Sequence, residues 1–260
     1  MKIATWNVNS VRARLDRLLD WLQKAQPDIV CLQELKARES AFPYDAIREA
    51  GYHAAVYGQP TFNGVGILSR IEPQNVQQGM NDDIEDPQAR FIAAQVGEIQ
   101  VISAYIPNGQ VVGSAHYAYK LDWLRRLRAF LEKNFTPQTP LVVCGDFNVA
   151  RDELDVADPV AWEESVLYHP TSRAALEELL SWGLVDVHRQ QHPEGRLYSW
   201  WDYRMLAFPK NDGLRLDYIF ATVPLAVRCI HAEIDRQERK GAKPSDHAPV
   251  VAVFFGHGAE

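Results

Sequence analysis

The residues with the clearest chemical potential in this chain are acids, amides, a tyrosine and a histidine that end or flank apolar, strand-like runs. The apolar run 29–33 leads to Glu34, and the run 141–145 leads to Asp146. Acids at strand ends are disfavoured in a protein core unless they are paired or bound to a metal. The full set is Asn7, Glu34, Tyr105, Asp146, Asn148, Asp217, Asp246 and His247.

If these strand ends converge, they form an oxygen-rich site. Carboxylate and amide oxygens suit Mg²⁺ or Mn²⁺, whereas zinc sites are built mainly from nitrogen and sulfur. Any one of these residues alone is more simply interpreted as a turn former or a helix cap. Their recurrence along one chain favours a shared site. His188 and His192 have a spacing that some zinc sites use, but the sequence offers no third ligand beside them.

The elements that must position these residues follow from apolar periodicity. Runs rich in Val, Ile and aromatic residues predict strands over 2–6, 28–32, 52–57, 64–69, 90–96, 100–105, 141–144, 216–221 and 250–255. Leucine spacing predicts helices over 15–22, 117–131 and about 176–180. Ser172 is the predicted N-cap of the third helix, and Gly183 lies just past its end. Lys120, Arg125 and Arg128 fall on other faces of the second helix than the leucine stripe.

The strands between residues 52 and 105 have no helix between them, so the chain is not a strict βαβ repeat. We expect an α/β fold in which a pair of mixed sheets is flanked by helices, as one domain over 1–260. The segment 151–171 has no clear period and is predicted to be a long functional loop. A chain of 260 residues can fold without a disulfide, and Cys31 and Cys144 lie in apolar runs typical of reduced core thiols.

Charge and composition exclude several classes of protein. Twenty-seven Lys and Arg against 34 Asp and Glu give a net charge of −7, which excludes binding of nucleic acid through bulk positive charge. Acids that hold a catalytic cation contribute to that balance, so a phosphate-handling site remains possible. The sequence predicts no membrane span and no secretory leader, and therefore a cytoplasmic protein. It also has no phosphate-binding glycine loop, so no nucleotide cofactor is expected.

Eight short strings run in order from residue 5 to residue 249. They are TWNVN at 5–9, LQE at 32–34, AYIPNG at 104–109, GDFN at 145–148, WGLVD at 182–186, SWWDYR at 199–204, LRLD at 214–217 and PSDHAP at 244–249. Together they resemble the exonuclease III family of Mg²⁺-dependent DNA-repair nucleases, within the endonuclease/exonuclease/phosphatase superfamily. The strings around Trp200 and at 214–217 are the more specific to the DNA-repair branch. One departure is Leu35, where that family usually carries Thr.

The resemblance implies a four-layered α/β sandwich, in which two packed mixed sheets have helices outside. It implies a monomeric Mg²⁺-dependent phosphodiesterase, with Mn²⁺ as a possible substitute, acting on duplex DNA with abasic sites or damaged 3′ ends. The implied activities are 3′-to-5′ exodeoxyribonuclease, abasic-site endonuclease and 3′-end cleaning. The implied metal ligands are Asn7, Glu34, Asp146, Asn148 and Asp246. The implied DNA contacts are Arg90, Asn108 and Arg204 at phosphates, and Trp200 and Leu216 in an apolar pocket for a baseless sugar or an unstacked nucleotide.

The resemblance also implies catalytic roles for five residues. Asp146 would orient and deprotonate the attacking water, with Asn7 and Asn148 holding Asp146 and the phosphate. His247 would stabilise developing charge or transfer a proton, with Asp217 orienting it. Tyr105 would bond the phosphate or, if ionised, assist the leaving group. The sequence leaves open which of these groups moves which proton.

Two other classes of function remain as alternatives. One is a phosphatase or phospholipid phosphodiesterase of the same superfamily, acting on inositol phosphates or lipid head groups. The strings around 200 and 214–217 count against it. The other is a nucleic-acid-binding module that has lost catalysis, and the intact set of polar strand-end residues counts against that.

Overall fold

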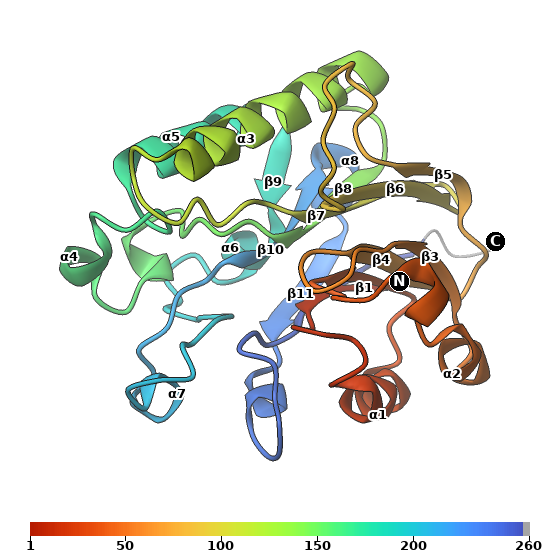
Figure 1. Ribbon diagram of the computed structural model, residues 1–260. Helices are drawn as coiled ribbons and strands as arrows, with labels where there is room; N and C mark the ends of the chain where they lie inside the picture. The colour runs from red at the N-terminus through yellow and green to blue at the C-terminus, as the bar shows by residue number, and fades with distance from the viewer. Residues whose placement is uncertain (257–260) are drawn as a thin grey trace.

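The computed structural model describes residues 1–256. Two six-stranded mixed sheets pack face to face, and helices cover both outer faces (Figure 1). This arrangement confirms the predicted four-layered α/β sandwich. The first sheet contains β1 (Lys2–Asn7), β2 (Ile29–Gln33), β3 (His53–Tyr57), β4 (Val65–Ser69), β11 (Cys229–Ile234) and β12 (Val250–Phe254). Its strand order is β11-β12-β1-β2-β4-β3.

The second sheet has the strand order β5-β6-β7-β8-β10-β9. Its strands are β5 (Gln74–Gln78), β6 (Phe91–Val96), β7 (Ile99–Tyr105), β8 (Leu141–Asp146), β9 (Leu184–Asp186) and β10 (Asp217–Thr222). All six residues of β8 are buried, because one face meets the other sheet and the opposite face meets helices.

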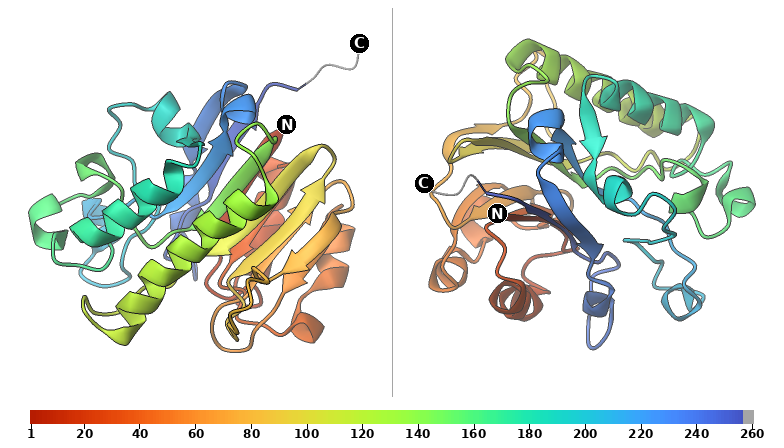
Figure 2. Two further views of the ribbon diagram at one scale, coloured as in Figure 1. Left: turned by 90° about the horizontal axis from the view of Figure 1, so that it is seen from above. Right: turned by 180° about the vertical axis from the view of Figure 1, so that it is seen from behind.

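Helices of two lengths complete the layers. The longer ones are α1 (Leu15–Ala25) on the first sheet, and α3 (Ala115–Asn134) with α5 (Pro170–Leu180), which lie side by side over the second (Figure 2). The shorter helices are α2 (Tyr44–Glu49), α4 (Pro159–Trp162), α6 (Val187–Gln191), α7 (Ala207–Lys210), α8 (Val223–Ala226) and the 3₁₀ turns η1 (Glu39–Ala41), η2 (Glu153–Asp155) and η3 (Arg236–Arg239). Within residues 1–256 no helix combines the length and apolarity needed to cross a bilayer.

Three apolar layers hold these elements together. Ile67, Val101 and Val142 are among the fully buried side chains between the two sheets. Trp6 and Trp21 pack edge to face beneath α1, with ring centroids 5.5 Å apart. A third cluster joins α3 and α5 to the outer face of the second sheet. Burial of apolar surface on both faces of each sheet fixes the register of strands that end in polar residues.

The structure corrects several predictions from local pattern. Three strands were missed: β5 is an exposed edge strand of mostly glutamine, β9 has three residues, and β11 was overlooked although its polar and apolar residues alternate as in a half-buried strand. The segment 151–171 is not an unstructured loop, since it contains η2 and α4. Ser172 does not cap α5. His169 is the N-cap, Pro170 begins the helix, and Ser172 is buried with its hydroxyl donating to the carbonyl of Val166.

The strand directions bring the polar ends to one edge of the sandwich. β1 and β2 are parallel, and so are β7 and β8, so the C-terminal ends within each pair lie side by side. Asp146 lies opposite Tyr105 on one side and opposite Asp217 on the other. This close pairing depends on Gly145, since a Cβ there would lie 1.8 Å from the carbonyl oxygen of Ala104.

Candidate active site

The candidate active site lies where the ends of the two sheets meet. The first sheet supplies Asn7 at the end of β1, Glu34 just after β2, and His247 just before β12. The second sheet supplies Tyr105, Asp146 and Asp217 in one row across β7, β8 and β10. The convergence predicted from the sequence is therefore present in the fold, and residues more than 200 positions apart become neighbours.

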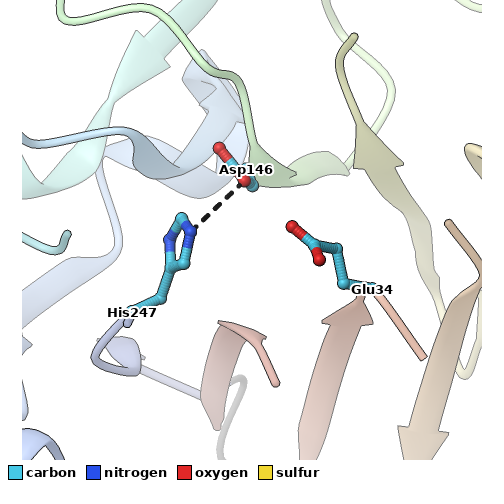
Figure 3. A group of neighbouring side chains, drawn as sticks. All are labelled: Glu34, Asp146 and His247. Atoms are coloured by element: carbon cyan, nitrogen blue, oxygen red, sulfur yellow. Dashed lines mark ion pairs between the residues drawn. The ribbon is translucent and has the colours of Figure 1, made fainter. Parts of the chain in front are cut away.

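Two carboxylates are the centre of this arrangement. Ligand atoms of Glu34, Asp146 and His247 lie within 4.8 Å of one another, and the three side chains point toward a common space (Figure 3). The amide nitrogen of Asn7 bridges the carboxylates, at 2.9 Å from Glu34 Oε1 and 2.9 Å from Asp146 Oδ2. The amide oxygen of Asn7 accepts from the backbone of Asn9. In this arrangement Asn7 holds the carboxylates together, whereas its predicted role as a metal ligand would use that oxygen.

Glu34 is held from several sides. Its backbone has a φ of 51°, in the left-handed region that residues with a side chain adopt infrequently. Tyr105 donates its phenol hydrogen to Glu34 Oε1 at 2.8 Å, and Lys36 Nζ lies 2.9 Å from Oε2. Burial alone raises the pKa of Glu34. The combined lowering effect of Lys36 and Asn7 is larger, so the pKa of Glu34 lies below its ordinary value. Burial and the negative charges of Glu34 and Asp146 raise the pKa of Tyr105 well above its ordinary value. The phenol of Tyr105 is therefore protonated here.

A buried histidine–aspartate pair faces Asp146. His247 Nδ1 lies 2.8 Å from Asp217 Oδ2, and His247 Nε2 lies 3.6 Å from Asp146 Oδ2. Burial lowers the pKa of His247, but Asp217 and Asp146 raise it more, to about 10. Burial raises the pKa of Asp146 to about 7, while His247 acts in the opposite direction. His247 is therefore a hydrogen-bond donor at neutral pH, and Asp146 titrates in the range that a general base requires.

Asn148 lies beside Asp146 on a tight turn. Its backbone φ is 50°, and its N–H donates to Asp146 Oδ1 at 2.9 Å. Its amide nitrogen donates to the carbonyl oxygen of Ile106 at 3.0 Å, and its amide oxygen accepts from Asn108 at 3.2 Å. The turn thus brings Asn148 and the exposed Asn108 together. Both residues were predicted to contact a phosphate group of the substrate.

The other predicted DNA contacts lie in different surroundings. Arg90 stacks on Tyr105, with its guanidinium 4.6 Å from the ring centroid, and donates to the Tyr105 carbonyl at 3.1 Å. Arg204 is exposed and pairs with Asp202. Trp200 is half-buried and packs edge to face on Trp162, with centroids 6.0 Å apart.

Asp246, a predicted metal ligand, and Leu216, predicted to line an apolar pocket, both lie beside Trp200. The Asp246 carboxylate accepts from Trp200 Nε1 at 3.0 Å and from Asn9 Nδ2 at 3.0 Å, and it is not part of the cluster of Glu34, Asp146 and His247. The Leu216 side chain is 1% exposed, within an apolar cluster on which Trp200 packs. In this arrangement Leu216 supports the indole and offers no surface of its own to a ligand.

Comparison with known proteins identifies the family. The family model described as "Endonuclease/Exonuclease/phosphatase family" matches residues 4–247. This chain belongs to that family. The resemblance predicted from the strings is thus confirmed, and the match spans every residue of the site from Asn7 to His247.

Individual relatives agree with the family assignment. The chain is 35% identical to exodeoxyribonuclease III of Haemophilus influenzae, over 98% of this chain and 100% of that protein. Among solved structures, it is similar to an AP endonuclease from Archaeoglobus fulgidus, with 42% identity and a TM-score of 0.96 over 98% of this chain and 100% of that one. It is also similar to the 3′ phosphatase NExo from Neisseria bound to a product DNA hairpin, with 40% identity and a TM-score of 0.95 over 98% and 100%.

Members of this family depend on divalent metal, and the donor set fits such an ion. The Glu34 and Asp146 oxygens are the hard, anionic ligands that oxygen-binding cations prefer. His247 Nδ1 is hydrogen-bonded to Asp217, and the raised pKa of His247 keeps a proton on Nε2. Nε2 is therefore a hydrogen-bond donor, whereas a zinc ligand needs an unprotonated ring nitrogen. His188 and His192 have adjacent rings but join no cluster of three ligands within residues 1–256.

Sequence reasoning missed three residues that support the site. Lys36 pairs with Glu34, and Ser199 Oγ donates to Asp217 Oδ2 at 2.6 Å. The third is Lys120, which was predicted to lie on a different face of α3 from the leucine residues. In the structure its side chain is fully buried. Its spacing from Tyr117 and Leu124, three and four residues, was the signal that places it on the buried face. Burial lowers the pKa of Lys120 to about 7, against the opposing effect of Asp146.

The buried thiols have no part in this chemistry. Cys31, Cys144 and Cys229 are free, and all three are buried. Burial and the neighbouring Cys31 raise the pKa of the Cys144 thiol well above its ordinary value, so Cys144 is not an activated nucleophile. Leu35, the departure from the DNA-repair pattern, points into the apolar layer beneath α1 and leaves Glu34 in place.

Proposed function

We propose that this protein is a Mg²⁺-dependent DNA-repair nuclease that degrades duplex DNA from 3′ ends, clears 3′ blocking groups and incises at abasic sites. One observation carries the proposal: two carboxylates, Glu34 and Asp146, meet a buried His247–Asp217 pair in a chain of this family. The names of its relatives, an exodeoxyribonuclease III, an AP endonuclease and a 3′ phosphatase, support the same three activities.

In the proposed reaction, each residue acts through the contacts described above. Asp146 accepts a proton from the attacking water, and the N–H of Asn148 keeps its carboxylate oriented. His247 donates from Nε2 to the charge that develops on the phosphate, while Asp217 fixes its ring. Tyr105 donates its phenol hydrogen to Glu34 and, when substrate is present, can turn that donor toward a phosphate oxygen.

The cation would be held by Glu34 and Asp146, with Asn7, Asn148 and Asp246 completing the proposed set of oxygen ligands. When bound, Mg²⁺ supplies a positive charge that offsets charge on the phosphate, and Mn²⁺ can replace it. Burial already disfavours the ionised form of Asp146, so a cation beside it would stabilise the carboxylate that the reaction needs.

The DNA would lie across the edge where the sheets meet. Arg90 and Asn108, which contact Tyr105 and Asn148, and the exposed Arg204 are proposed to contact phosphates. Half-buried Trp200 is proposed to form the wall of a pocket that receives a baseless sugar or an unstacked nucleotide. We further propose that residues 1–260 act as one domain and as a monomer in the cytoplasm.

Cleavage assays with end-labelled duplexes test this function. Three duplexes are needed, carrying a blunt 3′ end, a 3′ phosphate or an internal abasic site, each with Mg²⁺, with Mn²⁺ and with EDTA. The proposal predicts product from all three with either metal and none with EDTA. Inositol polyphosphate and sphingomyelin serve as the alternative substrates. Hydrolysis of either of these, with every duplex left intact, would refute the proposal.

A further inference from the structure

Lys120 is a buried lysine that no step of the proposed reaction uses. It lies on α3 with no exposed surface. Its ammonium donates to three backbone carbonyl oxygens, of Asn108 at 3.0 Å, Asn148 at 2.6 Å and Val166 at 2.7 Å. An ammonium has three N–H donors, so the three acceptors match it completely. No ion pair found within residues 1–256 includes Lys120, so these three carbonyls are the hydrogen-bond partners of its buried ammonium.

The three carbonyls come from three loops that surround the site. Asn108 follows β7, Asn148 follows β8, and Val166 belongs to the segment 151–171. Asn148 is therefore held at both ends, since Lys120 bonds its carbonyl while Ile106 and Asn108 bond its side-chain amide. That double restraint keeps a left-handed residue, with a φ of 50°, in a fixed place beside Asp146.

The loop after β7 is shaped to fit the lysine side chain. Gly109 has a φ of 93°, and a Cβ at this position would lie 3.0 Å from Cδ of Lys120 and 3.2 Å from the ring of Tyr117. Only glycine combines this backbone conformation with such close packing. Ser172 also donates to the carbonyl of Val166, so the segment 151–171 is tied to the same point by a second bond.

We infer that Lys120 is a positioning residue of the active site, whose ammonium fixes Asn148 and Asn108 relative to Asp146 and joins the segment 151–171 to them. The inference rests on the proposed function for the roles of Asn148 and Asn108. A residue that only stabilised the fold would affect activity equally whether or not the Asn148 amide was present. A residue that acts through the placement of that amide loses its effect when the amide is removed.

A double-mutant cycle between Lys120 and Asn148 tests the inference. Lys120→Met, Asn148→Ala and the double variant are compared with the parent in single-turnover cleavage of a duplex that the parent cuts, with saturating Mg²⁺ and enzyme. We expect Lys120→Met to lower the rate more than 20-fold in the parent and less than 3-fold in the Asn148→Ala background. The matched control is Lys133→Met, the same substitution at an exposed position of α3, which should stay within 2-fold of the parent.

Melting curves accompany each variant, so that rates are compared only below the melt. If Lys120→Met melts below the assay temperature, Lys120→Gln replaces it in the same cycle, because glutamine retains two N–H donors. Equal losses in the two backgrounds, or a parent-like rate for a folded Lys120 variant, would overturn the inference. Failure of the proposed function is distinguishable, since the parent itself would then cut none of the duplexes.

Discussion

Replacing Asp217 by asparagine separates the charge of this residue from its geometry. Asp217 Oδ2 accepts both His247 Nδ1, at 2.8 Å, and Ser199 Oγ, at 2.6 Å, whereas Oδ1 has no hydrogen-bond partner within residues 1–256. In Asp217→Asn the amide oxygen can occupy the position of Oδ2, so both hydrogen bonds survive and only the negative charge is lost. The amide nitrogen of the new asparagine would then occupy the position of Oδ1, which has no hydrogen-bond partner within residues 1–256.

The expected loss follows from the difference between charged and neutral hydrogen bonds. A buried hydrogen bond to a charged partner exceeds a neutral one by roughly 1–2 kcal/mol. If that difference appears fully in the transition state, kcat falls by about 5- to 30-fold. Asp217→Ala also removes both bonds, and we expect it to lower kcat by about 10²-fold or more. Because Asp217 raises the pKa of His247, Asp217→Asn should also move the basic limb of the kcat profile to lower pH.

Single-turnover cleavage of an abasic duplex with Mg²⁺, measured between pH 6 and pH 10, provides the assay. Asp45→Asn is the matched control, because Asp45 is exposed and pairs with Arg48 on α2. The reasoning is wrong if Asp217→Asn retains the rate and pH profile of the parent. It is equally wrong if Asp217→Ala costs no more than Asp217→Asn, since the geometry would then contribute nothing.

Three further predictions follow from the same site. Glu34→Ala should raise the Mg²⁺ concentration needed for half-maximal cleavage sharply, and full activity at low Mg²⁺ would remove Glu34 from the metal site. Trp200→Ala should lower kcat on the abasic duplex with a small change in melting temperature, because the indole is half-buried; a core residue would instead lose about 3–5 kcal/mol of stability at unchanged kcat below the melt. In EDTA the melting temperature of the parent minus that of His247→Gln should fall from pH 7 to pH 9.5, because the pKa of His247 is raised to about 10 and its stabilisation is complete below about 6.5 and lost toward 10. Taking the difference cancels the opposite contribution of Lys120, whose pKa is lowered to about 7, and a difference that stays constant with pH would show that His247 contributes nothing to it.

The sequence by itself determined the layers and most of the residues of the site. Apolar runs such as 141–144 predicted strands, and the polar residue that ends each run marked a candidate for a shared site. Glu34, Asp146 and His247 were identified in this way, because acids and histidine at the ends of buried strands require a partner.

Only the tertiary structure decided how these ends meet and which groups pair. Local pattern could not show that Asn7 bridges two carboxylates, that Asp246 bonds Trp200 and Asn9, or that Leu216 is buried behind the indole, since each contact joins distant parts of the chain. Strand β5 was missed because an exposed edge strand has no apolar pattern.

Lys120 shows the physical reason for this division most clearly. A lysine on a helix is normally solvated, because burying an ammonium is costly, and although the spacing of Lys120 from Tyr117 and Leu124 places it on the buried face of α3, that spacing does not show what would bind its charge. Its burial is possible only where three carbonyl oxygens converge on it, and they come from residues 108, 148 and 166. Periodicity describes which face of an element is apolar. The convergence of separate loops on one charge is a property of the folded chain alone.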